Sequence, residues 1–320
     1  MIVVTGAAGF IGSCLVSFLN RQGHEELILV DAIEKKNAPN LIGKKFREYI
    51  DRDLFLRWFE NNAAQIEFVF HIGARTDTTE WNEQIFEELN LNYSKHIWQS
   101  CASFGIPLVY ASSAATYGDG SFGYSDDHGN IPKLRPLNPY GWSKQYMDQW
   151  VLTQDEKPDR WAGFKFFNVF GPNEYHKGRM ASVIYHAFHQ IQNTGKMKLF
   201  RSNDPSIKDG EQKRDFIYVM DLLQVLYAFY KNIKPNGIYN LGSGEANTFK
   251  DLVKYCFEAL DLPEKIEFID MPIDLVNTYQ NYTCAEMQKL YQTGYDLKMC
   301  PFRDSVNSYV KYYLQNSIYY

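Results

Sequence analysis

The chain has 320 residues, of which 45% are hydrophobic and 22% charged, a balance typical of a soluble globular protein that excludes disorder and collagen-like structure. A formal net charge of −5 argues against nucleic acid or an anionic membrane surface as the main partner. The five cysteines show no Cys-x-x-Cys spacing, which favours reduced thiols. We expect neither a signal peptide nor a membrane-spanning segment, because the sequence shows no basic start and no long apolar run. These features predict a cytoplasmic protein that does not enter the membrane.

Short apolar runs alternate with longer amphipathic stretches in the first half of the chain. We predict strands at residues 2–5, 27–31, 67–72 and 108–112, with helical patterns that include 11–22 and 82–104. Strands that alternate with helices predict an α/β fold with a Rossmann-type, doubly wound parallel sheet.

The second half has a looser pattern that suggests a smaller, discontinuous α/β substrate-binding lobe. We predict strands at 163–169, 215–219 and 237–241, a helix at 221–231 and a loop at 201–213. The expected dinucleotide-binding domain comprises residues 1–167 with returns at about 214–245 and 278–300. The expected substrate lobe comprises residues 168–213, 246–277 and 301–320.

A glycine-rich turn follows the first strand and leads into the first helix. Gly6, Gly9 and Gly12 form a G-x-x-G-x-x-G pattern, which allows a tight turn and a close approach of a pyrophosphate to the backbone. The helix N-terminus that follows offers free N–H groups to the phosphates. This placement predicts a dinucleotide site, to which the small-residue turn at 72–75, after another strand, also contributes.

The residues after the second strand leave the choice of cofactor open. Asp31 stands where an acidic residue commonly binds the adenosine ribose hydroxyls, which favours NAD. Lys35, Lys36 and Arg52 could instead pair with a 2′-phosphate, which favours NADP. A solvated loop is an equally good interpretation of the two lysines.

Tyr140 and Lys144 form a Tyr-x-x-x-Lys pattern directly after Asn138-Pro139, a typical helix start. Their spacing places both side chains on one helix face. A nearby ammonium stabilises a phenolate, so we expect Tyr140 to act as a base below its usual pKa of about 10. Ser113, near the end of a predicted strand, could bind a substrate oxygen beside the tyrosine.

Together, these residues resemble the extended short-chain dehydrogenase/reductases, a family that acts mainly on nucleotide sugars. The segments 168–172, 214–219 and 239–242 also match, so the resemblance extends over nearly the whole chain. Residues 78–81, 112–118 and 176–183 resemble the members that invert C6 of the heptose in an ADP-heptose. His176-Lys177-Gly178 is the most specific of these matches.

The resemblance implies transient oxidation of the heptose to a ketone and its reduction from the other face. Tyr140, Ser113 and Lys144 would form the redox triad, and Lys177 would be the second acid/base. The resemblance also implies a homo-oligomer, a nucleotide-sugar substrate and, by preference, NADP over NAD. The implied cofactor residues are Gly6, Gly9, Phe10, Ile11, Gly12, Asp31, Ala32, Arg52, Ile72, Gly73, Ala74, Arg75, Asn90, Lys144, Val169 and Lys177. The implied substrate residues are Ser113, Asn168, Arg179, His186, Phe200, Arg201, Ser202, Arg214 and Tyr279.

Some positions depart from the family pattern or leave alternatives open. Arg179 stands where the family often has Ser, Arg52 where Lys is usual, and the segment 203–213 is longer than usual. A nucleotide-sugar 4-epimerase of the same fold is the alternative enzyme, and a catalytically silent NAD(P)-sensing regulator is the alternative from a different class. His186 and His189 lie three residues apart without a third ligand nearby in sequence, so we expect no metal site.

Overall fold

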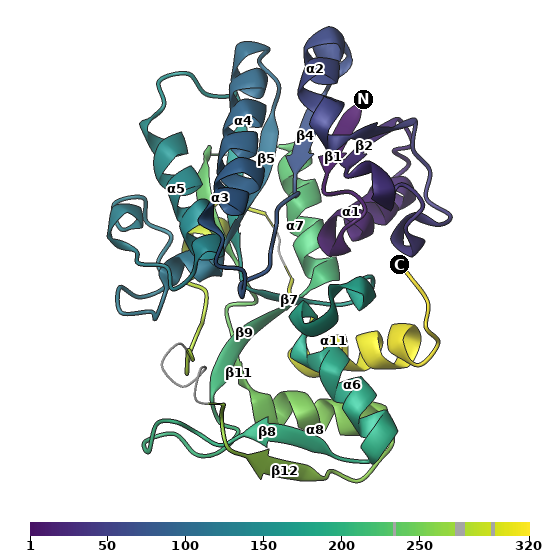
Figure 1. The fold of residues 1–320 in the computed structure, drawn as a ribbon, viewed down its shortest axis with the longest axis vertical. Coiled ribbons are helices and arrows are strands. Elements are labelled where there is room, and N and C mark those ends of the chain that lie inside the picture. Colours follow the sequence, from purple (N-terminus) through teal and green to yellow (C-terminus); the bar gives the residue numbers. More distant parts are fainter. Residues whose placement is uncertain (233–234, 273–278, 296–297) are drawn as a thin grey trace.

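The computed structural model describes residues 1–232, 235–272, 279–295 and 298–320. Its centre is a seven-stranded parallel sheet in the order β10-β6-β5-β4-β1-β2-β3 (Figure 1). The strands are β1 (Ile2–Thr5), β2 (Leu27–Asp31), β3 (Glu48–Asp51), β4 (Phe68–His71), β5 (Leu108–Ser113), β6 (Trp161–Phe166) and β10 (Gly237–Leu241). This order confirms the predicted Rossmann-type fold.

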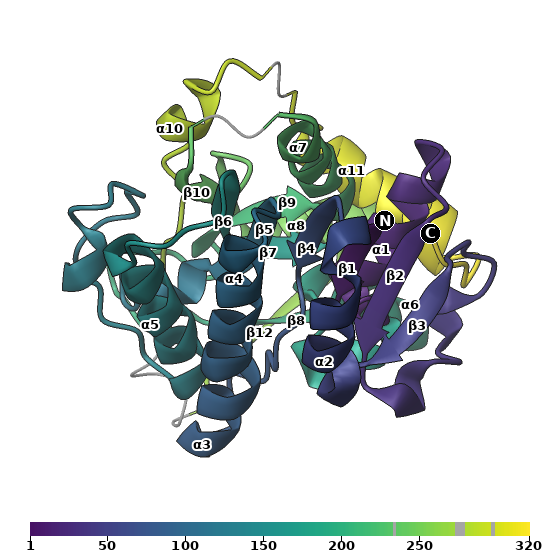
Figure 2. The same ribbon diagram turned by 90° about the horizontal axis from the view of Figure 1, so that it is seen from above.

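Helices cover both faces of this sheet (Figure 2). They are α1 (Phe10–Arg21), α2 (Arg52–Asn62), α3 (Glu83–Phe86), α4 (Tyr93–Ser103), α5 (Pro139–Thr153), α7 (Val219–Lys231) and α10 (Gln288–Tyr291). A π-helical turn, η4 (Glu87–Asn92), joins α3 to α4 and 3-10 turn η5 (Ala114–Tyr117) follows β5. Shorter 3-10 turns are η1 (Ile33–Lys35), η2 (Pro39–Leu41), η3 (Ala63–Gln65) and η6 (Ile131–Lys133).

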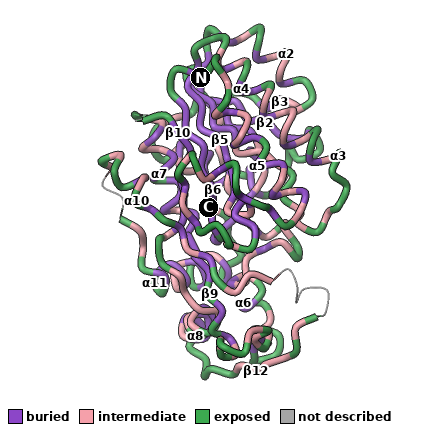
Figure 3. The backbone as a smooth tube through the Cα atoms, turned by 90° about the vertical axis from the view of Figure 1, so that its left-hand side faces the viewer, coloured by how far each residue is buried: buried purple, intermediate pink, exposed green. Residues whose placement is uncertain are grey.

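Strand residues alternate between two apolar cores, as the period of a β-strand requires. On one face of the sheet, Val4 and Leu29 pack in a cluster with α1 and α7. On the other face, Val3 and Ile28 pack with α2, α4 and α5. Figure 3 shows the strands of the sheet as the buried centre of the molecule. Burial on both faces explains why β1 and β2 are almost entirely apolar.

The remaining elements form a smaller region, at the lower end of Figure 1. Its strands are β7 (Asn168–Phe170), β8 (Met197–Phe200), β9 (Lys213–Tyr218), β11 (Ala246–Thr248) and β12 (Ile266–Ile269). Its helical segments are η7 (Tyr175–Met180), α6 (Val183–Thr194), α8 (Phe249–Ala259), α11 (Phe302–Ser308) and the π-helical η8 (Tyr309–Leu314). One sheet has the order β11-β9-β7, and β12 pairs with β8.

Two features of the sheets differ from the predicted strands. The stretch predicted as one strand at 163–169 is divided between β6, in the large sheet, and β7, in the small one. The edge strand β3 was not predicted, because only Tyr49 and Ile50 of its residues are buried. Across the residues that the structure describes, every helix is too short or too polar to cross a membrane.

Candidate active site

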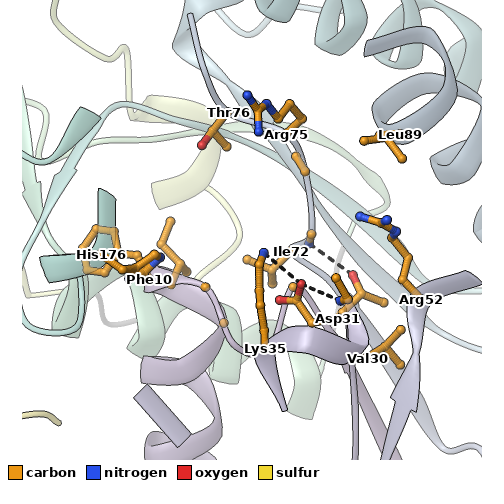
Figure 4. A pocket seen from close by; sticks show the side chains of 18 of the residues that line it. Phe10, Val30, Asp31, Lys35, Arg52, Ile72, Arg75, Thr76, Leu89 and His176 are labelled. Carbon is orange, nitrogen blue, oxygen red and sulfur yellow. Dashed lines mark hydrogen bonds and ion pairs between the residues drawn. The ribbon is translucent and has the colours of Figure 1, made fainter. Parts of the chain in front are cut away.

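A cavity of about 510 Å³ opens at the carboxyl ends of β1, β2 and β4 (Figure 4). The structure places most of the predicted cofactor residues on its walls. Its lining comprises Thr5, Gly6, Gly9, Phe10, Ile11, Gly12, Val30, Asp31, Ala32, Glu34, Lys35, Arg52, Ile72, Gly73, Ala74, Arg75, Thr76, Asp77, Leu89, Tyr93, His176, Lys177 and Met180. Ligands of open parallel sheets bind at this edge.

Two glycines of the glycine-rich turn, Gly6 and Gly12, have no room for a side chain. Gly6 has a φ of +66°, and a Cβ there would lie 2.5 Å from Gly73 Cα. A Cβ on Gly12 would lie 2.1 Å from the carbonyl oxygen of Gly6. Gly9 caps α1 without a side-chain hydrogen bond, and the first turn of α1 has no acidic residue. The turn therefore suits an anionic group such as a dinucleotide pyrophosphate.

Asp31 is the acidic residue at the end of β2, and its carboxylate has three partners. It accepts hydrogen bonds from the backbone N–H groups of Ala8, at 3.1 Å, and Ala32, at 2.9 Å. Lys35 Nζ forms an ion pair with it at 3.1 Å, drawn in Figure 4. Lys35 thus places a positive charge directly beside the expected ribose position.

Arg52 reaches the same cavity from the start of α2 (Figure 4). Its Nε lies 3.2 Å from Asp53 Oδ1, and a third of its side chain is exposed. Lys36, the other candidate for a 2′-phosphate, is exposed and is not among the lining residues, because it lies beyond the turn η1 that holds Lys35.

Asn90 and Val169 are predicted cofactor residues that do not line the cavity. Asn90 instead fixes the backbone of Arg75, from which it accepts an N–H hydrogen bond at 2.7 Å and to which it donates one at 2.9 Å. Val169 lies half-buried in β7. Asn90 therefore positions the backbone of a lining residue without lining the cavity itself.

Tyr140 and Lys144 lie in the first two turns of α5, whose N-terminus is capped by Asn138. Lys144 Nζ donates a 2.8 Å hydrogen bond to the carbonyl of Ala111, and burial lowers its pKa to about 8. Burial raises the pKa of Tyr140, and a hydrogen bond with Ser113 opposes that rise. The expectation of a lowered tyrosine pKa is therefore wrong for the chain's own residues, because desolvation of the phenolate outweighs the nearby polar groups.

Lys177 lies in η7, in the wall of the cavity that faces the glycine-rich turn. Its Nζ is 5.3 Å from the centre of the Phe10 ring, within the range of a cation–π contact. Burial lowers the pKa of Lys177, and the negative charge of Glu174 opposes this shift. Among the described residues that line the cavity, Tyr140, Ser113 and Lys144 do not appear.

Three of the predicted substrate residues gather near one another in the smaller region. The Arg214 guanidinium lies 5.2 Å from the centre of the Tyr279 ring, and Phe200 makes an edge contact with that ring at 6.5 Å. Arg214 is 8% exposed, and its guanidinium also lies 5.5 Å from the centre of the Phe249 ring. This cluster is suited to a base and a phosphate, through stacking and charge.

Other predicted substrate residues are engaged elsewhere. Arg201 pairs with Asp209 at 3.2 Å and with Asp270 at 3.3 Å, and Ser202 donates from its backbone to Asp209 at 2.8 Å. Asn168 donates to the carbonyl of Asp215 at 2.9 Å. His186 lies exposed on α6, and Arg179 bonds Thr79 across the cavity entrance.

Several residues on the cavity were not predicted as site residues. Those that were missed are Thr5, Val30, Glu34, Thr76, Asp77, Leu89, Tyr93, His176 and Met180. Lys35, which the sequence offered as a candidate for a 2′-phosphate, does line the cavity. His176 stands beside Lys177, and its Nδ1 lies 3.2 Å from Asn40 Nδ2. Leu89 and Tyr93 reach the cavity only because η4 and α4 pack beside β4.

Comparison with known proteins gives consistent matches. A sequence profile described as the NAD dependent epimerase/dehydratase family matches residues 2–242. The chain is 42% identical to an ADP-L-glycero-D-manno-heptose-6-epimerase of Fusobacterium nucleatum, covering 98% of both chains. It is 44% identical to one of Nitratidesulfovibrio vulgaris, again covering 98% of both. The crystal structure of the Helicobacter pylori ADP-L-glycero-D-manno-heptose-6-epimerase superposes with a TM-score of 0.81 at 28% identity, over 97% of this chain and 94% of that one.

Proposed function

The chain belongs to the NAD dependent epimerase/dehydratase family, and we propose that it inverts C6 of the heptose in ADP-D-glycero-D-manno-heptose to give ADP-L-glycero-D-manno-heptose. The observation that carries this proposal is Lys177 on the wall of the cofactor cavity, packed over Phe10. It supplies a proton-carrying group in addition to Tyr140, which an epimerisation at C6 requires. The near full-length relatives support the choice of sugar.

The reaction needs a hydride acceptor, because the C–H bond of a carbinol is not acidic. A nicotinamide dinucleotide held at the glycine-rich turn would supply this acceptor for the hydride of C6, and the donor for its return to the opposite face. The glycine-rich turn and the uncapped start of α1 fit a dinucleotide, since neither Gly6 nor Gly12 has space for a side chain.

We assign Tyr140 as the group that accepts the hydroxyl proton of one epimer. Burial disfavours its phenolate, and the hydrogen bond with Ser113 stabilises it. Lys144 holds a positive charge one helical turn away. When hydride returns to the other face, the alkoxide points in a new direction and needs a proton from another group. Lys177, whose pKa burial brings down, serves that role.

We propose NADP as the cofactor, held at its 2′-phosphate by Lys35 and Arg52. The Lys35–Asp31 ion pair offsets the negative charge of Asp31, which would otherwise repel a phosphate. NAD is the alternative, with Asp31 on the ribose hydroxyls.

We also propose that the smaller region binds the nucleotide sugar and that the chain forms a homo-oligomer. The Arg214–Tyr279–Phe200 cluster supports the first of these proposals. For the second, a groove of about 300 Å³ between α3 and α5, lined by aromatic residues such as Trp142 and Tyr146 and by Glu83 and Glu87, is the contact surface that we propose. Light scattering of the purified protein tests the oligomer.

The activity is tested by incubating the purified protein separately with each C6 epimer of the ADP-heptose. We expect both reactions to reach the same mixture of epimers without added cofactor, as resolved by chromatography. UDP-glucose serves as the control substrate. Conversion of UDP-glucose to its C4 epimer, with the ADP-heptoses unchanged, would favour the 4-epimerase instead.

A further inference from the structure

Glu174 is a fully buried carboxylate at the base of the loop that carries Lys177. The Ser182 backbone N–H donates to Oε2 at 2.6 Å, and the Ser182 hydroxyl donates to Oε1 at 2.7 Å. The Gly171 N–H approaches Oε1 at 3.4 Å. Both oxygens of Glu174 therefore act as acceptors, as in an ionised carboxylate. Burial raises the pKa of Glu174, and the hydrogen bonds from Ser182 and the charge of Lys177 oppose this rise.

The two bonds to Ser182 close the segment between Glu174 and Ser182 into a loop. Ser182 also caps α6, because its hydroxyl accepts the Tyr185 N–H at 3.2 Å. The carboxylate therefore sits at the positive end of a twelve-residue helix, where negative charge is stabilised. Within the loop, the Lys177 N–H donates to the carbonyl of Glu174 at 2.9 Å.

The buried carboxylate of Glu174 interacts electrostatically with only a few ionisable side chains among the residues that the structure describes. The ionisable side chains that interact with it are Cys14 from α1, Tyr175 and Lys177 from η7, Tyr185 from α6 and Tyr309 from η8. His176 is the other titratable neighbour of Lys177. Among these groups, Lys177 is the cation, and its ammonium interacts with the carboxylate through charge without a direct ion pair.

We propose that Glu174 is the positioning residue for Lys177: its carboxylate closes the loop that holds Lys177 against the cavity and supplies the negative charge that faces the ammonium. This inference rests on the proposed role of Lys177 as second acid/base. A buried lysine without such a partner would lose its proton more easily, because desolvation disfavours the charged form. Glu174 thus keeps Lys177 able to donate a proton near neutral pH.

Glu174→Gln tests the charge. A glutamine can still accept from the Ser182 N–H and donate to the Ser182 hydroxyl, so the loop stays closed. We expect the pKa of Lys177 to fall by about 1 pH unit or more. It is measured by acylating the protein over a range of pH and quantifying the Lys177 peptide by mass spectrometry. Asp221→Asn, which removes a buried carboxylate from α7, is the matched control and should leave the Lys177 pKa unchanged.

Ser182→Ala tests the closure of the loop, and it remains informative if Glu174→Gln does not fold. It keeps the charge of Glu174 but removes the hydroxyl bond. We expect amide hydrogen exchange at residues 175–181 to accelerate about tenfold, with a smaller change in the Lys177 pKa. Unchanged exchange in this variant, an unchanged Lys177 pKa in Glu174→Gln, or an equal shift in Asp221→Asn would each overturn the inference.

The pH profile of turnover separates this inference from the proposed function. If protonated Lys177 is the acid, the alkaline limb of the Glu174→Gln profile moves to lower pH together with the measured Lys177 pKa. If the pKa moves and the profile does not, Glu174 positions Lys177 as inferred and the acid/base role of Lys177 is the part that fails.

Discussion

Asn90 Nδ2 donates a 3.0 Å hydrogen bond to Ser143 Oγ. Ser143 Oγ donates in turn to the carbonyl of Tyr140 at 2.7 Å, while Asn90 also binds the backbone of Arg75. A continuous hydrogen-bonded path therefore links the wall of the cofactor cavity to the helical turn that carries Tyr140. The proposed triad of Tyr140, Ser113 and Lys144 lies outside the lining of the cavity, and this path fixes one relative to the other.

Replacing Tyr140 with Phe removes the proton acceptor and keeps the ring. We expect epimerisation to slow by at least about a hundredfold, or about 3 kcal/mol of barrier, with the fold intact. Tyr227→Phe is the matched control, since Tyr227 and Lys231 share the same spacing on α7, outside the candidate site. Turnover of the Tyr140 variant close to that of the Tyr227 variant would refute the assignment.

Replacing Lys177 with Met keeps the stem over Phe10 and removes the ammonium. We expect epimerisation to be abolished and cofactor binding to be largely retained, as measured by fluorescence titration. Lys198→Met, on the exposed side of β8, should have no effect on either. If saturating substrate restores the turnover of the Lys177 variant, Lys177 serves only to bind a phosphate and the mechanism lacks its second base.

Lys35 and Arg52 are expected to determine the cofactor. The purified protein should release NADP on denaturation, as identified by chromatography. Lys35→Ala and Arg52→Ala should each weaken NADP binding about tenfold and NAD binding much less, because each removes one cation from the 2′-phosphate. Lys36→Ala, which lies off the cavity, is the control. Recovery of NAD alone, with affinity unchanged in both variants, would contradict the choice of NADP.

His71 makes the stability of the protein depend on pH. It lies between Thr5 Oγ1, at 2.7 Å, and Ser94 Oγ, at 2.8 Å, and burial together with the Lys144 charge lowers its pKa to about 3. Between this value and the ordinary histidine pKa of about 6.5, the unfolded chain binds more protons than the folded one. The free energy of unfolding should therefore fall with falling pH in this window, with a contribution of up to about 1.4 kcal/mol per pH unit.

Urea denaturation at several pH values measures this dependence. His71→Gln cannot titrate and should show a flatter decline below about pH 6.5. His96→Gln, at an exposed position on α4, should follow the original protein. The same slope in all three proteins would assign the acid sensitivity to other groups.

The sequence was most informative where local pattern and burial coincide. β1 and β2 were predicted because a short apolar run is typical of a strand that is buried on both faces. The glycine-rich turn was predicted because its glycines are spaced closely between a strand and a helix. β3 was missed because Glu48 and Asp51 at its ends are not buried. Arg201 was expected to bind the substrate, and its ion pairs with Asp209, eight residues later, and with Asp270, after β12, could not be predicted from the local sequence. The position of Lys177 over Phe10 likewise depends on how η7 packs against α1, which no local pattern encodes.

Arg179 connects two segments that contribute to the lining of the cavity, one through Asp77 and the other through Met180. Its Nη2 donates to Thr79 Oγ1 and lies 3.6 Å from Asp77 Oδ1, while the neighbouring Met180 accepts a weak hydrogen bond from Thr78. Arg179→Ser restores the residue that the family often has, and we expect the cofactor to dissociate about two- to fivefold faster at low salt. Release is followed by exchange with labelled cofactor.

The salt dependence of cofactor release distinguishes the charge of the Arg179–Asp77 ion pair from the packing of the Arg179 side chain. Because the Arg179–Asp77 pair is exposed, the difference between the variant and the original protein should nearly vanish at about 0.5 M salt. Lys196→Ser removes a comparable exposed ion pair, with Glu267, away from the cavity and should leave release unchanged. A faster release in Arg179→Ser that persists at high salt would mean that the arginine acts by packing over the entrance, and equal rates at low salt would mean that the bridge does not retain the cofactor.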